Sequence, residues 1–327
     1  MSEWQKIKAY LQGQKNIILL VHEKPDGDCM GAALALAHHL QMEGYSPSLY
    51  NPDAIPMIYS FLPGQEMIKT YKDKRLPEGI PIIVIDCADQ GRIRYVLPEN
   101  VPIINIDHHV SNNYFGSYNL VDTKAAATGE IIYKLLVESE ESINSFTATC
   151  LYVALSSDTG SFKYSNTTAR TFRYASELVE LGADMELIRY NLFERRPISE
   201  LLMMKLALTN MKQSVDKRII WTALSYRKLA ENNLLQTDTD SVISLMRSTE
   251  GIEIAFVIKE LEPNLVKVSL RSKKYFDVNV LANKFHGGGH SRAAGCTIKG
   301  DLNEIVINII STAKGCLKDY CVEGDES

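Results

Sequence analysis

The chain has 327 residues, of which 45% are hydrophobic and 23% charged, and its formal net charge at pH 7 is -5. This length exceeds what one ordinary hydrophobic core serves, so we expect about two domains. The acidic balance argues against a protein that coats long nucleic acid, because such proteins carry a basic surface. A small anionic substrate is compatible with it, since a bound metal ion supplies positive charge locally.

The six cysteines are dispersed and include no Cys-x2-Cys pair, so they predict neither a zinc site of that type nor a disulfide framework. The first residues have the pattern of a polar amphipathic helix and lack the apolar core of a signal peptide. No apolar run approaches the roughly 20 residues that span a bilayer. We therefore expect a cytoplasmic protein that does not interact with membranes.

Apolar segments of strand length recur in the first part of the chain, at residues 16–23, 47–51, 80–87 and 101–109. Between the first two, residues 28–44 have a helical pattern that ends at a glycine. Strands that are apolar nearly throughout and alternate with helices are typical of a parallel sheet covered on both faces. The predicted fold class is α/β, with a mostly parallel sheet and flanking helices.

From about residue 126 the sequence has mainly helical patterns, and further on strand patterns return. Helical patterns follow one another over residues 127–140, 144–158, 167–182 and 185–196. After a break at "ERRPIS", strand patterns at residues 218–226, 252–261 and 265–273 alternate with helices. This predicts a smaller C-terminal α/β domain. We expect a first domain over residues 1–193, a linker helix over 194–212 and a second domain over 213–327.

Carboxylates and imidazoles gather at four places where a predicted strand or helix ends. They are His22, Asp26 and Asp28 after the first strand, Asp86 after the next, Asp107, His108 and His109 after the third, and Asp158 at a helix end. In an open α/β sheet, ligands bind beyond the carboxyl ends of the strands. The first three clusters should therefore line one crevice, which the fourth closes from the side.

Such a crowd of carboxylates needs compensating positive charge, because clustered anions cost several kcal/mol, to order of magnitude. The four segments contain no comparable set of Lys or Arg residues. A pair of divalent cations resolves the conflict, and mixed carboxylate and imidazole ligands suit manganese, iron or zinc better than magnesium. A single Asp after a strand is usually a cap or turn residue. Four clusters at element ends instead indicate a metal centre.

The segments "HEKPDGD", "DHH" and "SDTG" closely resemble the DHH phosphoesterase superfamily, and "FHGGGHSRAAG" resembles its DHHA1 substrate-binding domain. All the motifs occur in the family order and cover nearly the whole chain. Length and domain content are most similar to the nanoRNase/pAp-phosphatase group of bacterial enzymes. The resemblance implies a DHH metal-binding catalytic domain over residues 1–193 and a DHHA1 domain over 213–327.

The resemblance also implies two divalent ions, most often manganese. The implied ligands are His22, Asp26 and Asp86 for the first ion, and Asp28, Asp86, His108 and Asp158 for the second. Paired ions of this kind activate a water molecule and neutralise phosphoryl oxygens, so little covalent participation by the protein is required.

Two residues of the third cluster are expected to act in catalysis without binding metal. Asp107 is expected to fix an imidazole by a hydrogen bond, and His109 is expected to face the substrate. Neighbouring residues of a strand point to opposite sides, so the side chains of His108 and His109 should diverge.

The second domain is expected to hold the remainder of the substrate. The implied binding residues are Arg271, Ser272, Gly287, Gly288, Gly289, His290 and Arg292. Glycines let backbone N–H groups approach an anion, and an arginine can hold a phosphate through two hydrogen bonds.

These observations predict a metal-dependent phosphohydrolase that cleaves short oligoribonucleotides, removes the 3′-phosphate of 3′-phosphoadenosine 5′-phosphate (pAp), or does both. One alternative is a phosphodiesterase for cyclic dinucleotides or linear pApA. Another is a non-catalytic nucleotide-binding protein that kept the fold. A structural metal protein is a further alternative, but closed structural zinc sites favour Cys and His ligands. No long nucleic acid is expected as a partner, and a homodimer is expected only from the general frequency of dimers.

Overall fold

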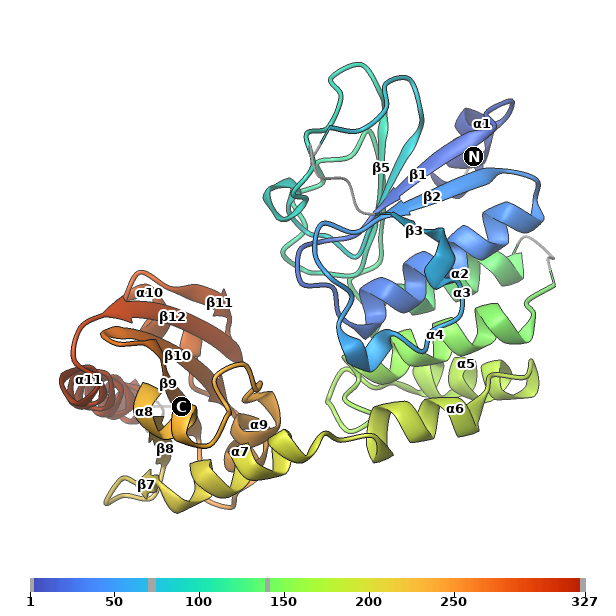
Figure 1. The fold of residues 1–327 in the computed structure, drawn as a ribbon. Coiled ribbons are helices and arrows are strands. Elements are labelled where there is room, and N and C mark those ends of the chain that lie inside the picture. The colour runs from blue at the N-terminus through green and yellow to red at the C-terminus, as the bar shows by residue number, and fades with distance from the viewer. Residues whose placement is uncertain (1–2, 70–74, 139–141, 324–327) are drawn as a thin grey trace. The chain divides into compact units, whose positions relative to one another are not determined.

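The chain divides between Arg195 and Arg196 into two units, each with its own sheet and core (Figure 1). The computed structural model describes residues 3–69, 75–138 and 142–323. The predicted linker segment 194–212 contains helix α7 (Ile198–Thr209), whose Met203 and Ala207 are buried in a core of the second unit. In the structure this helix is therefore part of the second unit.

The first unit contains a six-stranded parallel sheet in the order β3-β2-β1-β4-β5-β6. Its strands are β1 (Asn16–Leu20), β2 (Ser46–Tyr50), β3 (Ile68–Lys69), β4 (Ile82–Ile85), β5 (Ile103–Asp107) and β6 (Tyr118–Val121). The four predicted strands and their parallel arrangement are confirmed. The edge strands β3 and β6 escaped prediction because one has two residues and the other is only partly buried along its length.

Helices cover one face of this sheet (Figure 1). The helices of the unit are α1 (Glu3–Leu11), α2 (Gly27–Met42), α3 (Thr128–Glu138), α4 (Ser145–Asp158), α5 (Ala169–Glu180) and α6 (Met185–Arg189), the last followed by a π-helical turn (Tyr190–Glu194). On the other face, irregular chain supplies Leu76, Ile93 and Tyr95, which pack on Ile18 and Val84 of the sheet. The helical layer therefore lies on one side, and loops replace it on the other.

Helices α2 and α4 pack with unusually close backbones. A Cβ atom added to Gly31 of α2 would lie 2.3 Å from the carbonyl oxygen of Cys150 in α4. A Cβ atom at Gly27 would lie 2.8 Å from the side chain of Ser157. These glycines allow the C-terminal end of α4, which carries Asp158, to approach the N-terminal end of α2.

The second unit contains a mixed six-stranded sheet in the order β11-β12-β10-β9-β8-β7, in which only β8 and β9 pair in parallel. Its strands are β7 (Met211–Gln213), β8 (Ile219–Leu224), β9 (Ile254–Glu262), β10 (Leu265–Ser272), β11 (Gly288–His290) and β12 (Ala293–Lys299). Its remaining helices are α8 (Tyr226–Glu231), α9 (Asp240–Ser248), α10 (Val278–Asn283) and α11 (Leu302–Glu323). The predicted C-terminal α/β fold is confirmed.

Within the described ranges, no helix combines the length and the apolar character that a membrane crossing requires.

Candidate metal centre

The carboxyl ends of β1, β4 and β5 meet at one edge of the first sheet, because these strands are parallel neighbours. His22 lies two residues beyond β1, Asp86 directly follows β4, and His108 directly follows β5. The end of α4 adds Asp158. The structure therefore brings together side chains from all four predicted clusters.

The backbone at the start of helix α3 holds the side chain of Asp28, which belongs to α2. Its side chain is fully buried, and its two oxygens accept hydrogen bonds from the backbone N–H groups of Thr128 (2.6 Å) and Gly129 (2.9 Å). Backbone N–H groups at a helix N-terminus favour a negative charge. Burial, followed by the charges of Asp86 and Asp158, nevertheless raises the pKa of Asp28 well above its ordinary value. This carboxylate therefore lacks sufficient positive charge in the protein alone.

Asp86 lies at the middle of the cluster. Its φ angle is +56°, a left-handed conformation that non-glycine residues adopt rarely and that often marks a functional site. Its carboxylate lies 3.6 Å from His22 Nε2 and 3.7 Å from His108 Nε2. Burial alone would raise the pKa of Asp86, but the neighbouring ring of His22 and the charges of His108 and His109 outweigh it and lower the pKa to about 2. The Asp86 carboxylate is therefore ionised and lies between the rings of His22 and His108.

His108 points Nε2 into a group of carboxylates. This atom lies 3.1 Å from Asp158 Oδ2, 3.7 Å from Asp86 Oδ1 and 3.8 Å from Asp28 Oδ2. It is buried, yet it makes no hydrogen bond of acceptable geometry. Burial lowers the pKa of His108, but the adjacent carboxylate of Asp158 and the charges of Asp28 and Asp86 outweigh it and raise the pKa to about 10. A buried imidazole nitrogen that faces three carboxylates without a good partner fits a site built for a cation.

His109 is turned toward a buried carboxylate behind it. Its Nδ1 lies 2.7 Å from Oδ1 of Asp107, which is fully buried and also accepts a hydrogen bond from Asn112 Nδ2 (2.6 Å). Burial lowers the pKa of His109, but this hydrogen bond and the charges of Asp86 and Asp107 raise it overall. The expected pairing of Asp107 with an imidazole thus occurs in the structure, with His109 as the partner.

The expectation that His108 and His109 diverge is wrong. The two ring centroids are only 4.6 Å apart, and His109 Nδ1 lies 3.6 Å from Asp86 Oδ1. The physical reason is that β5 ends at Asp107, so the alternation of a strand no longer applies to the two histidines.

On the side of β1, His22 is fixed by the backbone next to it. Its Nδ1 lies 2.7 Å from the carbonyl oxygen of Glu23, and its Nε2 faces Asp86. Asp26 caps helix α2 by accepting a hydrogen bond from Cys29 N (3.0 Å). Burial, followed by the charges of Asp86 and Asp158, raises the pKa of Asp26 to about 6.

Three groups of side chains place their ligand atoms close enough to hold a metal ion, each with its atoms within 4.8 Å of one another. They are His22 with Cys29 and Asp86, Asp86 with His108 and His109, and Asp28 with His108 and Asp158. Asp26, implied as a ligand by the resemblance, is in none of these groups, and the group that contains His22 includes Cys29. The donor set of carboxylates and imidazoles fits a divalent cation.

Two residues that the sequence analysis did not identify hold side chains of the centre in place by hydrogen bonds. Thr128 donates its hydroxyl to Asp86 Oδ1 (2.9 Å) while its N–H holds Asp28. Asn112 bonds both Asp107 and Asn105 and so fixes the support behind His109. The only local signal for Thr128 is its place at the beginning of a predicted helix.

The glycine-rich segment of the second unit forms a hairpin. Gly288 and Gly289 of β11 pair with Gly295 and Ala294 of β12. A Cβ atom at Gly287 would lie 2.3 Å from the carbonyl oxygen of Gly295. At Gly289, where φ is +148°, a Cβ atom would lie 2.5 Å from the carbonyl oxygen of Ala293. Close packing against β12 therefore requires glycine at positions 287 and 289, whatever the hairpin binds.

The other predicted binding residues differ in how freely they can reach a ligand. Ser272 is fully buried and donates its hydroxyl to the carbonyl oxygen of Ser291 (3.2 Å), so it supports the hairpin turn from inside. Arg292, on that turn, is exposed and donates to the carbonyl oxygen of Phe276. Arg271 lies 3.5 Å from Asp240. The side chain of His290 lies outside the described residues.

Comparison with known proteins matches a family model to each of the two units. Residues 16–155 match the model of the DHH family, N-terminal domain, and residues 216–319 match the DHHA1 domain. The chain is 30% identical, over 95% of its length and 94% of the relative, to the bifunctional oligoribonuclease and PAP phosphatase NrnA of Thermus thermophilus. It is 24% identical over 90% of its length to the cyclic-di-AMP phosphodiesterase PdeA of Listeria monocytogenes, of which it covers 46%.

A solved structure has a similar fold throughout. An exopolyphosphatase-related protein from Bacteroides fragilis superimposes with a TM-score of 0.89 at 24% identity, covering 97% of this chain and 96% of that one. At this identity the match demonstrates the shared fold and nothing further.

Proposed function

Because the chain belongs to the DHH family with a C-terminal DHHA1 domain, we propose that it is a metal-dependent hydrolase of phosphoester bonds in short oligoribonucleotides and in pAp. The observation that carries this proposal is the buried Nε2 of His108, which faces Asp28, Asp86 and Asp158 without a hydrogen-bond partner. Such an arrangement supports a cation at this position. The similarity to the Thermus thermophilus relative supports the substrate class.

We propose two divalent ions, most simply manganese, as the cofactors. Asp86 is positioned to serve both sides of the centre, with His22 on one side and His108, Asp28 and Asp158 on the other. When bound, such ions supply positive charge to phosphoryl oxygens and make a water molecule acidic enough to attack phosphorus near neutral pH.

The protein's own contribution is to fix these groups and to hold a proton. Helix α3 holds the carboxylate of Asp28, and the carbonyl of Glu23 fixes the ring of His22 so that Nε2 faces Asp86. Asp107 accepts a hydrogen bond from Nδ1 of His109 and favours the protonated imidazole. The second ring nitrogen of His109 is then an N–H donor suited to the leaving oxygen.

The second unit is proposed to bind the nucleotide portion. The exposed Arg292 on the hairpin turn and Arg271 at the end of β10 supply cations for a phosphate. The buried Ser272 supports this turn and is proposed to act through it.

A substrate panel tests the proposal. Purified protein with Mn²⁺ is incubated with di- to pentaribonucleotides, pAp, pApA and cyclic di-AMP, and kcat/KM is compared with and without a chelator. We expect the highest values for short RNA and pAp and complete loss with chelator. Activity that survives exhaustive metal removal contradicts the proposal.

The relative named as a cyclic-di-AMP phosphodiesterase supports a second candidate, hydrolysis of cyclic dinucleotides or pApA. A higher kcat/KM on cyclic di-AMP or pApA than on short RNA selects this candidate. Nucleotide binding without hydrolysis of any substrate, even of an activated phosphodiester, would instead indicate a non-catalytic nucleotide-binding protein.

A further inference from the structure

Arg92 reaches the edge of the metal centre from a short turn after β4. The turn (Gln90–Arg92) is capped by Asp89, whose side chain accepts a hydrogen bond from Gly91 N at 2.7 Å. The carbonyl of Arg92 accepts a hydrogen bond from Glu23 N at 3.0 Å. The guanidinium places Nη2 at 3.0 Å from His22 Nδ1. The turn thus fixes a cation beside one of the proposed metal ligands.

The contact with His22 does not satisfy this cation. His22 Nδ1 also lies 2.7 Å from the carbonyl oxygen of Glu23, which can only accept a hydrogen bond. Nδ1 therefore carries the proton, as it must if Nε2 is to bind a metal. A protonated Nδ1 cannot accept from Arg92, so two N–H groups face each other across 3.0 Å.

Among the described residues, Arg92 also lacks an anionic partner of the kind that Arg94 and Arg170 possess. Arg94, two residues further on, forms an ion pair with Glu23, and Arg170 pairs with Glu130. Among the residues that the structure describes, no carboxylate lies within ion-pair distance of the Arg92 guanidinium. A half-buried guanidinium next to the candidate metal centre is therefore available for an anion that the described part of the chain does not supply.

We propose that Arg92 binds a non-bridging oxygen of the phosphoryl group that is cleaved, and that it stabilises the negative charge that develops there. The proposal rests on the proposed function and adds a residue to it. A guanidinium matches the geometry of a phosphate and keeps its charge at every relevant pH. Before substrate binds, the group rests against His22, and the phosphoryl oxygen replaces this poor contact with a charge-assisted hydrogen bond.

The alternative is that Arg92 only braces the ring of His22. The two roles differ in what a substitution changes first. A brace acts on metal affinity, because loss of ligand orientation weakens metal binding. A phosphate-binding residue acts on the affinity for a phosphate monoester in the metal-loaded protein, and its removal leaves metal affinity unchanged or improves it, since one cation near the site is gone.

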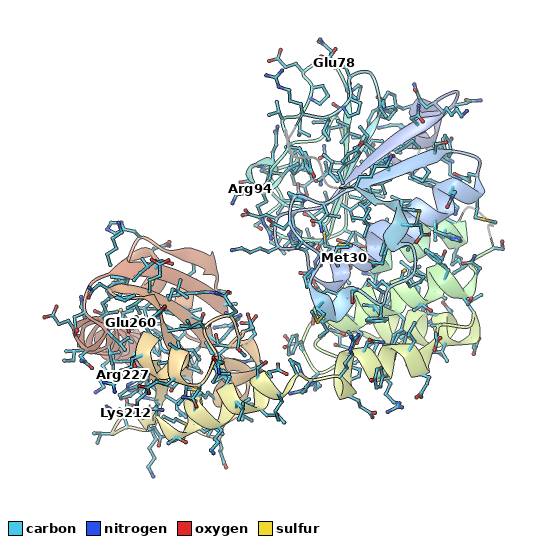
Figure 2. All side chains as sticks on the ribbon, in the orientation of Figure 1. Met30, Glu78, Arg94, Lys212, Arg227 and Glu260 are labelled. Atoms are coloured by element: carbon cyan, nitrogen blue, oxygen red, sulfur yellow. The ribbon has the colours of Figure 1, made fainter. Side chains whose placement is uncertain are left out.

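The test compares Arg92→Gln and Arg92→Lys with Arg94→Gln. Arg94, which is labelled in Figure 2, is the matched control because its guanidinium is exposed and forms an ion pair with Glu23. Calorimetry measures Mn²⁺ binding to the metal-free protein and AMP binding to the Mn²⁺-loaded protein. Kinetics measure kcat/KM for pAp and for bis-p-nitrophenyl phosphate, which has no base.

For Arg92→Gln we expect unchanged or tighter Mn²⁺ binding, at least tenfold weaker AMP binding, and a loss of about 10²–10³-fold in kcat/KM on both substrates. The AMP affinity and kcat/KM of Arg92→Lys should lie between those of Arg92→Gln and the parent protein. Those of Arg94→Gln should stay within about twofold of the parent protein. Weaker Mn²⁺ binding in Arg92→Gln, or unchanged AMP affinity, overturns the proposal. A parent protein that hydrolyses no phosphoester overturns the proposed function instead, while the AMP comparison still decides the role of Arg92.

Discussion

Thr128 illustrates how much of the proposed metal centre depends on side chains that are not proposed to bind metal. Its N–H and hydroxyl hold two different carboxylates, Asp28 and Asp86, which come from different elements. Partners of this kind fix the orientation of ligands and often matter nearly as much as the ligands themselves. The geometry of the centre is therefore a property of the hydrogen bonds around it as well as of the acidic cluster.

We predict that Thr128→Val weakens Mn²⁺ binding by about 10- to 100-fold, because Asp86 loses the hydroxyl that orients it. Thr128→Ser, which keeps the hydroxyl, should restore most of the affinity. Calorimetric titration of both variants with Mn²⁺ measures the difference. Equal affinity in Thr128→Val and the parent protein would show that this hydrogen bond is dispensable.

His109 allows a second prediction at the same scale. His109→Ala should bind Mn²⁺ nearly as the parent protein does but lose about 10²–10⁴-fold in kcat, because the proton donor supported by Asp107 is gone. Metal titration and steady-state kinetics on the same preparation separate the two effects. A variant with unchanged kcat would remove His109 from the mechanism, and one with much weaker metal binding would make it a ligand.

The pKa of His108 gives a prediction for pH. In the metal-free protein this pKa is raised to about 10, so the stabilisation it brings is complete below its ordinary value of 6.5 and is lost as pH rises toward 10. A metal ion must displace this proton, so Mn²⁺ affinity should increase by about tenfold per pH unit between pH 7 and 9. Calorimetry in buffers with different ionisation enthalpies should detect about one proton released at neutral pH. A pH-independent affinity would contradict the prediction.

At the scale of elements, the approach of α2 and α4 brings together a carboxylate from the N-terminal end of α2 and another from the C-terminal end of α4. Gly31 is the point of closest contact, and Asp28 lies one turn before it in the same helix. Asp158 closes α4 at the corresponding end. The glycine is therefore required by the packing that also assembles the centre.

Gly31→Ala should destabilise the protein by about 1–3 kcal/mol or more, because its Cβ would meet the backbone carbonyl of Cys150 and the helices must separate. The same separation should weaken Mn²⁺ binding. Gly315→Ala in α11 is the matched control, since nothing lies within 4 Å of the added Cβ. It should be neutral or stabilising by up to about 1 kcal/mol. Urea unfolding of both variants measures the effect, and an equal response of the two would refute the packing argument.

At the scale of the whole molecule, the two units divide the proposed work. Every proposed metal ligand lies in the first unit, and every proposed nucleotide-binding residue of the hairpin lies in the second. The two tryptophans of the chain, Trp4 and Trp221, are likewise in different units. Their fluorescence therefore provides a separate report of each unit.

We predict that Mn²⁺ stabilises the first unit and leaves the second nearly unchanged. At 100 times its Kd an ion adds about 2.7 kcal/mol to the stability of the state that binds it. Thermal unfolding is followed in Trp221→Phe and Trp4→Phe, which retain one fluorophore each, with Mn²⁺ and with chelator. The Tm reported by Trp4 should rise with Mn²⁺, and Asp28→Asn should abolish the rise. An equal shift reported by Trp221 would show that the units unfold together.

The sequence by itself determined the α/β class, the second domain and the element ends at which His22, Asp86, His108 and Asp158 appear, because hydrophobic periodicity and strand ends are local properties. Only the tertiary structure decided which groups touch. The bond between Thr128 and Asp28 spans 100 positions and the one between Thr128 and Asp86 spans 42, and no local pattern encodes either. The turn of His109 toward Asp107, the burial of Ser272 and the position of Arg92 beside His22 likewise depend on chain segments that meet only when the protein folds.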